Sequence, residues 1–267
     1  MSKRALLTIL CPFLWLCIGC AINPITGEEE IMFFPERDDV AIGQKYAPEI
    51  EKELGGKIDN PQLQNYVDFV GQKVARVSHS PDWDYHFVAL KDKAVNAVSL
   101  PGGYVFITKG MLKKMDSEAQ LAAVLSHEVA HVVARDAANV MSTQIGIDVL
   151  LSAATTGKAP GDVMTAANLA RQILSLRYSR EDEETADQTG LEYMVRAGYN
   201  PYGMIETMQM LQNQHEGGPT DILSTHPAPQ NRIMYLREKI QTRYPSVTGL
   251  KIGKEDYHSN VLDRLSN

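Results

Sequence analysis

The residues best suited to chemistry are His127, Glu128 and His131, in the pattern His-Glu-x-x-His. Side chains four residues apart share one face of an α-helix, so both imidazoles can reach one metal ion while Glu128 reaches a water beside it. This pattern is typical of a zinc site with its own general base. The alternative is that His127 and His131 are core histidines and that Glu128 lies on a solvated edge. Burying such polar side chains on an apolar helix costs free energy unless they have partners. The spacing predicts a zinc site, provided that a helix and a third ligand exist.

A helix around these residues is indicated by its predicted start. Ser117 and Gln120 have the spacing of a capping box, and Asp116 and Glu118 place negative charge where the helix dipole favours it. Apolar residues then repeat at helical spacing, namely Leu121, Val124, Leu125, Val129 and Val132. The two histidines are therefore expected in the middle of a largely apolar helix.

The third ligand is expected from the acidic segment 179–187. Glu183 and Asp187 are four residues apart, so a helix presents one carboxylate to zinc and the second to the free N–H of a ligating histidine. The alternative is an acidic, solvated helix start, which alone accounts for Glu181 and Asp182.

The segment from Ser179 to Gly190 reads Ser-Arg-x-x-Glu-x-x-Ala-Asp-x-x-Gly, and it resembles a motif of the zinc metallopeptidases related to HtpX and the CAAX prenyl protease, a gluzincin group. Other matching stretches are 96–97 with 100–104, 126–131, and 224–227 followed by 232–233. The resemblance covers about residues 40–240. It implies one zinc ion per chain with ligands His127, His131 and Glu183. It also implies that Glu128 is the catalytic base and that Asp187 accepts the free N–H of a ligating histidine.

Hydrolysis of a peptide bond follows from this set of residues. Zinc held by three protein ligands keeps a position for water, lowers the pKa of that water and polarises the substrate carbonyl. Glu128 is expected to take the proton of the water and deliver it to the leaving amine. His226 is predicted to stabilise the oxyanion, because it lies in the stretch 224–227 that the resemblance places near the active-site cleft. Two alternatives stay open: His226 ligates zinc in a resting state, or it only packs beside Pro227. Arg232 either contacts the acidic segment or faces solvent.

A small antiparallel sheet is predicted between residues 83 and 108, where apolar residues alternate around turn signals. The resemblance implies that an edge strand beside the zinc helix pairs with the substrate backbone. We assign this strand to residues 95–99, with Asn96, Ala97 and Val98 as the contacting residues. The alternative is an ordinary strand whose edge is covered.

The rest of the chain reads mainly as helices, so the fold class is α+β: a mainly helical zincin-type domain with a small antiparallel sheet beside the His-Glu-x-x-His helix. Helices are expected over residues 36–54, from Pro61, twice within 139–178, from after Pro201 to Asn213, and from Pro229. Ile145 to Thr156 is too short to span a bilayer. The predicted domain covers 37–245, and the tail 246–267 is expected to be weakly structured.

Composition agrees with one globular domain, because 267 residues with 44% apolar and 22% charged residues are ordinary values. The formal net charge is −7. An acidic chain of this kind is not expected to bind nucleic acid.

The amino terminus resembles a lipoprotein signal peptide over residues 1–19. Lys3 and Arg4 precede an apolar run, and 17–20 is similar to a bacterial lipobox, although Cys17 stands where leucine is usual. Lipidation of Cys20 is predicted, with 20–36 as a tether; the alternatives are ordinary cleavage nearby or an uncleaved anchor. Ala21 favours the outer membrane. Cys11, Cys17 and Cys20 are the only cysteines, so no disulfide is expected in the mature chain.

The sequence therefore predicts a zinc metalloendopeptidase, lipid-anchored in the cell envelope and facing the periplasm, that hydrolyses unfolded or misassembled envelope proteins. The alternative is a non-enzymatic chaperone or assembly factor for outer-membrane proteins. The presence of Glu128 favours the enzyme, because binding alone does not require a base. The sequence does not indicate the oligomeric state.

Overall fold

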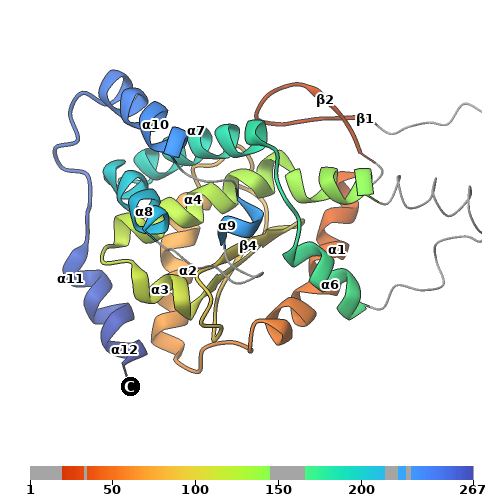
Figure 1. Ribbon diagram of the computed structural model, residues 1–267, viewed down its shortest axis with the longest axis horizontal. Coiled ribbons are helices and arrows are strands. Elements are labelled where there is room, and N and C mark those ends of the chain that lie inside the picture. The colour runs from red at the N-terminus through yellow and green to blue at the C-terminus, as the bar shows by residue number, and fades with distance from the viewer. Residues whose placement is uncertain (1–19, 33–34, 145–165, 214–221, 227–229, 267) are drawn as a thin grey trace, which may run out of the picture.

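A computed structural model describes residues 20–32, 35–144, 166–213, 222–226 and 230–266 (Figure 1). The helices are α1 (Glu36–Glu53), α2 (Pro61–Ala75), α3 (Lys109–Lys114), α4 (Glu118–Ala134), α6 (Ala166–Leu174), α7 (Arg180–Arg196), α8 (Tyr202–Gln212), α9 (Ile222–Thr225), α10 (Gln230–Arg243), α11 (Lys254–Tyr257), the π-helical turn η2 (His258–Leu262) and α12 (Asp263–Leu265). The strands are β1 (Cys20–Ile22), β2 (Glu29–Ile31), β3 (His86–Leu90), β4 (Ala97–Leu100) and β5 (Tyr104–Thr108). The mainly helical α+β fold class is confirmed.

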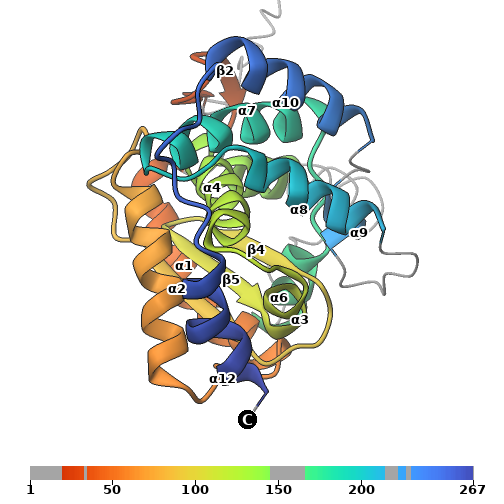
Figure 2. The ribbon, with the colours of Figure 1, turned by 90° about the vertical axis from the view of Figure 1, so that its left-hand side faces the viewer.

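Helix α4 is the centre of the molecule, and every one of its residues is buried. The predicted cap is present, because the Ser117 hydroxyl accepts a hydrogen bond from the Gln120 amide at 3.3 Å. The Gln120 side chain accepts from the Asp116 amide at 2.7 Å, one residue before the position that a capping box uses. Helices α2, α7 and α8 pack around α4 (Figure 2). A helix enclosed in this way presents its polar residues only to other protein groups or to a ligand.

The sheet beside α4 has the strand order β3-β5-β4 and is mixed. Strands β4 and β5 are antiparallel, as predicted, whereas β3 and β5 pair in parallel from His86 opposite Tyr104 to Leu90 opposite Thr108. The expectation of a wholly antiparallel sheet is therefore wrong for β3. After β3 the chain forms β4 at the opposite edge of the sheet, and β5 then lies between β3 and β4. The alternation of apolar residues in the sequence does not indicate this order.

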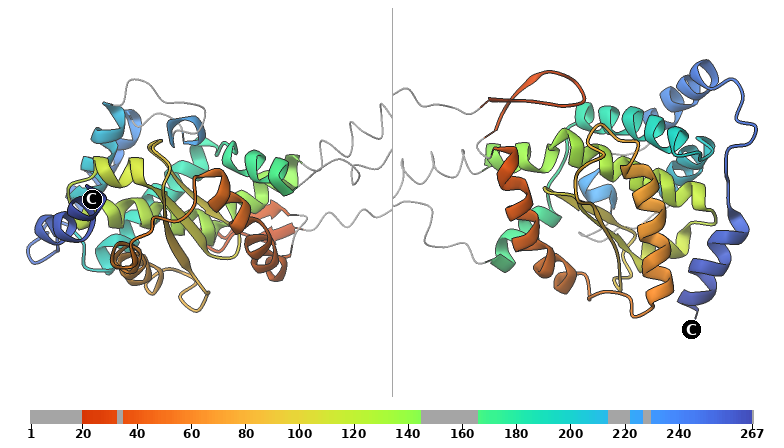
Figure 3. Two further views of the ribbon diagram at one scale, coloured as in Figure 1. Left: turned by 90° about the horizontal axis from the view of Figure 1, so that it is seen from below. Right: turned by 180° about the vertical axis from the view of Figure 1, so that it is seen from behind.

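The C-terminal segment contradicts the expectation of a weakly structured tail. Elements α11, η2 and α12 pack on the body beside α2 and α3 (Figure 3). Tyr257 and Val261 are fully buried, Leu265 is nearly so, and the Tyr257 hydroxyl donates to the carbonyl of Leu112 at 2.7 Å. Each of these elements has only three to five residues, which is too short for helical periodicity to be recognised.

A hairpin of β1 and β2 begins the described chain. The Glu30 carboxylate accepts hydrogen bonds from Asn23 at 2.7 Å within the hairpin and from Asn139 of the helical segment 136–144 at 2.6 Å. Ile25 also packs against the main hydrophobic core. The hairpin is thus fixed to the body.

The other predicted helices agree with α1, α2, α8 and α10 to within a few residues. The signal peptide 1–19 and the whole stretch Ile145 to Thr156 lie outside the described residues. Among the helices that the structure does describe, none combines the length and the apolar character needed to cross a bilayer.

Candidate metal centre and active site

Helices α4 and α7 bring the three predicted zinc ligands together. The Nε2 atoms of His127 and His131 are 3.0 Å apart. Glu183, from α7, places Oε1 at 3.5 Å from Nε2 of His131 and Oε2 at 3.7 Å from Nε2 of His127. His226, which follows α9, joins them with Nδ1 at 3.3 Å from Nε2 of His127 and 2.5 Å from Oε1 of Glu183. All four side chains are buried.

These separations fit a tetrahedral ion. Ligand atoms bound at zinc–nitrogen and zinc–oxygen distances lie roughly 3.3 Å from one another around a tetrahedral centre. One donor atom from each of His127, His131, Glu183 and His226 lies within 4.8 Å of every other. The donor set of three imidazoles and one carboxylate also suits zinc.

Two carboxylates hold the other ring nitrogens of the helix α4 histidines. Oδ1 of Asp187 lies 3.1 Å from Nδ1 of His127, and Oδ2 of Asp136 lies 2.6 Å from Nδ1 of His131. Such partners fix the tautomer of a ligating histidine and turn its Nε2 toward the metal. Asp187 was predicted for this contact, whereas Asp136 was not.

Asp136 reaches His131 because of an unusual turn at the end of α4. Arg135 has φ of 63°, the only positive φ of a non-glycine residue in the described chain. Its guanidinium is buried and binds Asp39 of α1 through two hydrogen bonds of 2.6 and 2.9 Å. The sequence does show an acidic residue five positions after His131, which could have indicated this contact. The side chain of Asp136 reaches His131, however, only because of the left-handed turn at Arg135.

Arg232 of α10 contacts the acidic segment, which decides between the two predicted alternatives. Its guanidinium donates to Asp187 at 2.7 and 2.6 Å and to Glu183 at 2.5 Å. The Tyr235 hydroxyl also donates to Asp187. These donors neutralise and orient two buried carboxylates that would otherwise be costly to desolvate.

Close packing of α7 on α4 is required for these contacts, and it depends on Gly190. A Cβ atom at Gly190 would lie 3.0 Å from the backbone nitrogen of His127. The glycine at the end of the predicted motif therefore allows Glu183 and Asp187 to approach the histidines.

Glu128 is buried, and neither of its carboxylate oxygens has a hydrogen-bond partner among the residues described. A buried carboxylate without a partner is unfavourable in an isolated protein. Nε2 of His226 is 3.9 Å from Oε1 of Glu128. The carboxylate is therefore placed to meet a water or substrate beside the donor cluster.

Tyr178 is a further residue that the sequence did not indicate. Its ring stacks on that of His131 with centroids 4.2 Å apart and planes 16° apart, and it lies 5.3 Å from the ring of His226. It precedes the predicted motif by one residue, in a segment without periodicity, so no pattern pointed to it. Together with Asp136 it fixes the plane of the His131 ring.

Charges around the cluster shift the pKa values of its members. Burial opposes the imidazolium of His131, but hydrogen bonds to Asp136 and Glu183 outweigh it and raise the pKa to about 10. Burial and the neighbouring charge of His131 lower the pKa of His127. Burial opposes ionisation of Glu183, yet His226 and His131 hold its pKa well below the usual range. The site therefore carries an anionic Glu183 beside a histidine that binds protons tightly.

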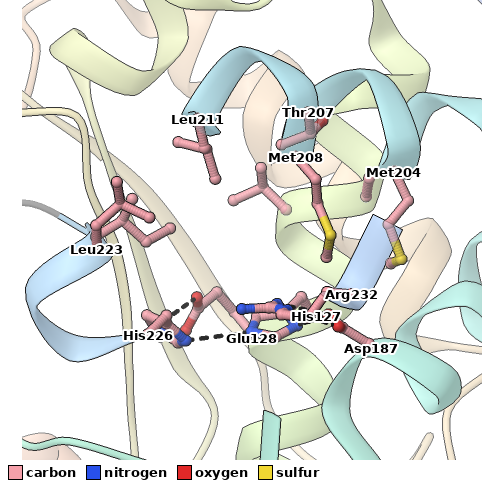
Figure 4. Close-up of a pocket in the computed structure, with 13 residues that line it drawn as sticks. His127, Glu128, Asp187, Met204, Thr207, Met208, Leu211, Leu223, His226 and Arg232 are labelled. Atoms are coloured by element: carbon pink, nitrogen blue, oxygen red, sulfur yellow. Dashed lines mark hydrogen bonds and ion pairs between the residues drawn. The ribbon is translucent and has the colours of Figure 1, made fainter. Parts of the chain in front are cut away.

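A pocket opens beside Glu128 and is walled mainly by α4 and α8 (Figure 4). Its apolar lining comes from Ala123, Val124, Met204, Met208, Leu211, Ile222 and Leu223. Most of the polar groups in the lining, namely His127, Glu128, Asp187, His226 and Arg232, lie at one end, whereas Thr207 of α8 lies on the opposite wall. This arrangement offers an apolar side chain a place next to the reacting groups.

The predicted substrate strand lies at the edge of the sheet. Strand β4 contains Ala97 and Val98, is paired only with β5 in the described sheet, and contacts α4. Asn96 precedes it, and its carbonyl accepts from the Thr108 amide at 3.0 Å. The alternation of an antiparallel ladder then turns the backbone groups of Ala97 and Ser99 away from β5, toward the outer edge. Cys20, at the start of β1, lies away from this site (Figure 1).

Comparison with known proteins agrees with this geometry. Residues 61–240 match peptidase family M48. The chain is 26% identical to the beta-barrel assembly-enhancing protease of Escherichia coli K12, over 71% of this chain and 41% of that protein. It is 33% identical to the mitochondrial metalloendopeptidase OMA1 of Schizosaccharomyces pombe, over 65% of this chain and 52% of that protein. It is 30% identical to the mitochondrial metalloendopeptidase OMA1 of Arabidopsis thaliana, over 79% of this chain and 42% of that protein.

The chain spans about half the length of the curated relatives it matches. The match to the family covers more than half of the chain and includes both helices that carry the donor cluster. The chain therefore belongs to peptidase family M48.

Proposed function

We propose that this protein is a zinc metalloendopeptidase. The observation that carries the proposal is the meeting of His127, His131 and Glu183 beside Glu128, a buried carboxylate without a partner in the described structure. Names of the relatives as proteases and metalloendopeptidases support it.

His127, His131 and Glu183 would hold the zinc ion. When bound there, zinc supplies Lewis acidity toward water and the substrate carbonyl. Asp136 accepts a hydrogen bond from Nδ1 of His131, and Asp187 lies 3.1 Å from Nδ1 of His127, so the Nε2 atoms of both histidines are directed into the cluster. Arg232 keeps Glu183 and Asp187 ionised in a buried setting.

Glu128 acts as general base and then as general acid. Its free carboxylate oxygens can accept a proton from the attacking water and deliver it to the leaving amine. Strand β4 holds the substrate as an added strand through the outward backbone groups of Ala97 and Ser99. Asn96, Ala97 and Val98 thus remain the proposed substrate strand, with Asn96 and Val98 bonded inward to β5.

His226 has two proposed roles, and its position supports the resting-state one. Its Nδ1 lies among the donor atoms, so it can occupy the fourth metal position. The same short segment reaches β4, because the Ile222 amide donates to the carbonyl of Val95 at 3.0 Å. In that state a substrate would have to displace both His226 from the donor cluster and Ile222 from the strand. In the other role His226 stabilises the oxyanion.

Replacing His226 by Ala separates these roles. Resting-state coordination predicts that cleavage of an unfolded substrate becomes faster, whereas oxyanion stabilisation predicts a fall in kcat by about a hundredfold or more. Zinc content measured on the same samples excludes metal loss as the cause.

For the cellular role, we propose lipidation at Cys20, attachment to the outer membrane facing the periplasm, and cleavage of unfolded or misassembled envelope proteins. The relatives named for beta-barrel assembly support a role in the envelope. A chaperone or assembly factor without peptidase activity is the second candidate, favoured only by those same names.

The deciding experiment compares wild type with Glu128→Gln. Both should contain zinc, and only wild type should cleave an unfolded β-barrel protein, with cleavage lost on chelation. Wild-type protein that contains zinc but shows no Glu128-dependent cleavage would contradict the enzyme. Glu183→Ala separately tests the third ligand, because unchanged zinc affinity in that variant would exclude it.

A further inference from the structure

A second hollow lies outside the active site, on the face formed by the start of α2, helix α3 and the C-terminal helix α12. Its volume is about 820 Å³, within the range of small-molecule sites. The residues that line it include five cations and one acid, namely Lys91, Lys93, Lys109, Lys113, Arg264 and Asp59. On a chain with a formal net charge of −7, this is a marked concentration of positive charge.

These cations are not used elsewhere in the described structure. Lys91, Lys93, Lys109 and Lys113 form no ion pair with any acidic group in the described ranges, and Arg264 donates only to the neutral side chain of Gln62. The Nε atom of Arg264 is buried and has no hydrogen-bond partner among the described residues. Five cations around one hollow repel each other, and an anion placed between them would relieve that repulsion.

The backbone that carries the lysines is held in place before any ligand binds. The amides of Lys91 and Asp92 donate to the carbonyls of Gly56 and Leu54 at 2.9 and 3.1 Å. The Gly110 amide donates to the carbonyl of Asp92 at 3.0 Å. A Cβ atom at Gly110 would lie 2.2 Å from the carbonyl oxygen of Lys93, so this glycine lets α3 pack directly on the loop. An ordered loop reduces the entropy cost of binding a ligand.

We propose that this hollow, here called the basic hollow, binds a small ligand that carries two or more phosphate groups. Several flexible ammonium groups and one guanidinium match the separate charges of such a ligand. Helices α3 and α12, which border the basic hollow, and the β1–β2 hairpin lie at opposite ends of the molecule (Figures 1 and 3). This position favours a dissolved ligand over the headgroups of a membrane that holds Cys20.

The test measures binding of tripolyphosphate to the zinc-loaded, full-length protein by calorimetry, and binding to vesicles of phosphatidylglycerol by sedimentation. The variant Lys91→Glu/Lys93→Glu reverses two charges of the basic hollow. The matched control, Lys52→Glu/Arg237→Glu, makes the same change in net charge at exposed positions on α1 and α10. Any removal of zinc by the anion affects both variants alike.

We expect saturable binding of tripolyphosphate that weakens with added salt, falls by about tenfold or more in the Lys91→Glu/Lys93→Glu variant, and persists in the control. Equal loss in both variants would reduce the effect to net charge and overturn the proposal. Binding to vesicles without binding of tripolyphosphate would also overturn it. These measurements do not depend on peptidase activity, so their outcome is independent of the function proposed above.

Discussion

At the scale of single residues, the least expected contact in the site is that between Asp136 and His131. Replacing Asp136 by Ala removes the acceptor for Nδ1 of His131, so the ring loses its orientation. We expect zinc affinity to fall by roughly 10- to 100-fold, as for other partners of ligating histidines. Competition with a chelator measures the change, and Asp116→Ala, an exposed carboxylate, is the control. Equal affinities for the two variants would exclude a positioning role.

The pKa of His131 predicts how metal binding depends on pH. Without metal, burial is outweighed by Asp136 and Glu183, and the pKa is about 10. Zinc binds only the neutral Nε2, so about one proton should leave His131 on binding near pH 8, and affinity should rise as the pH rises. Calorimetry in buffers of different ionisation enthalpy counts the protons. Asp136→Ala, which removes the main interaction that raises the pKa, should release fewer.

The raised pKa of His131 also determines how the stability of the metal-free protein changes with pH. The folded pKa of His131 exceeds its ordinary value of 6.5, so its contribution is fully present below about pH 6.5 and is lost as the pH rises through about 10. Chelated protein should therefore lose this part of its stability between those values. Unfolding curves in urea at pH 6.5 and pH 9.5 with chelator test the direction.

The zinc-site prediction depended on residues whose chemistry is local. His127, Glu128 and His131 share one helix face, and the pair Glu183 and Asp187 shares another, so spacing alone indicated them. Asp136 and Tyr178 could not be found in this way. Asp136 is directed by the left-handed turn at Arg135, which is held by Asp39, a residue 96 positions earlier in the chain. Such a contact is fixed by tertiary packing.

At the scale of elements, the pocket between α4 and α8 predicts substrate preference. Met208 lines this pocket, so a peptide with leucine beside the scissile bond should be cleaved faster than one with serine. Met208→Gln keeps an unbranched side chain but makes the wall polar, and the ratio of kcat/KM for the two peptides should fall by roughly tenfold. Met234→Gln, at an exposed position on α10, should leave the ratio unchanged. A ratio that is the same in all three proteins would contradict this use of the pocket.

Elements were predicted in proportion to their length. Helices α2 and α4 show both a capping residue and several turns of apolar periodicity, and their starts were correct. The pairing of β3 with β5 was not, because five-residue strands show alternation but not the identity of their neighbours. The short helices at the C-terminus had no readable period at all.

At the scale of the whole molecule, the C-terminal segment closes the start of α4. The amides of Glu118 and Ala119 donate to the carbonyls of Gly253 and Ile252 at 3.2 and 3.0 Å. The buried carboxylate of Glu118 accepts from Tyr66, Tyr199 and Lys251 at 2.7 to 2.8 Å. This C-terminal segment therefore supplies partners to the helix that carries His127 and His131.

This role predicts a large loss of stability for Tyr257→Ala. The side chain is fully buried and bonded to Leu112, so its removal should cost about 3–5 kcal/mol, the usual effect of deleting a buried aromatic ring. Urea unfolding of the full chain measures it. Ile252→Ala, at a site 44% exposed, should change stability by less than about 1 kcal/mol. Similar values for the two variants would mean that the segment is not part of the cooperative unit.

The β1–β2 hairpin has a consequence for the way a tethered molecule could work. Cys20 is the first residue of β1, and Glu30 and Ile25 fix the hairpin to the body within a few residues of it. A lipid at Cys20 would leave no slack between the anchor and the folded protein. Helix α4 would then stay at a constant height above the bilayer, with little freedom to rotate about the anchor. A substrate protein would therefore have to extend a strand far enough from the membrane to contact β4.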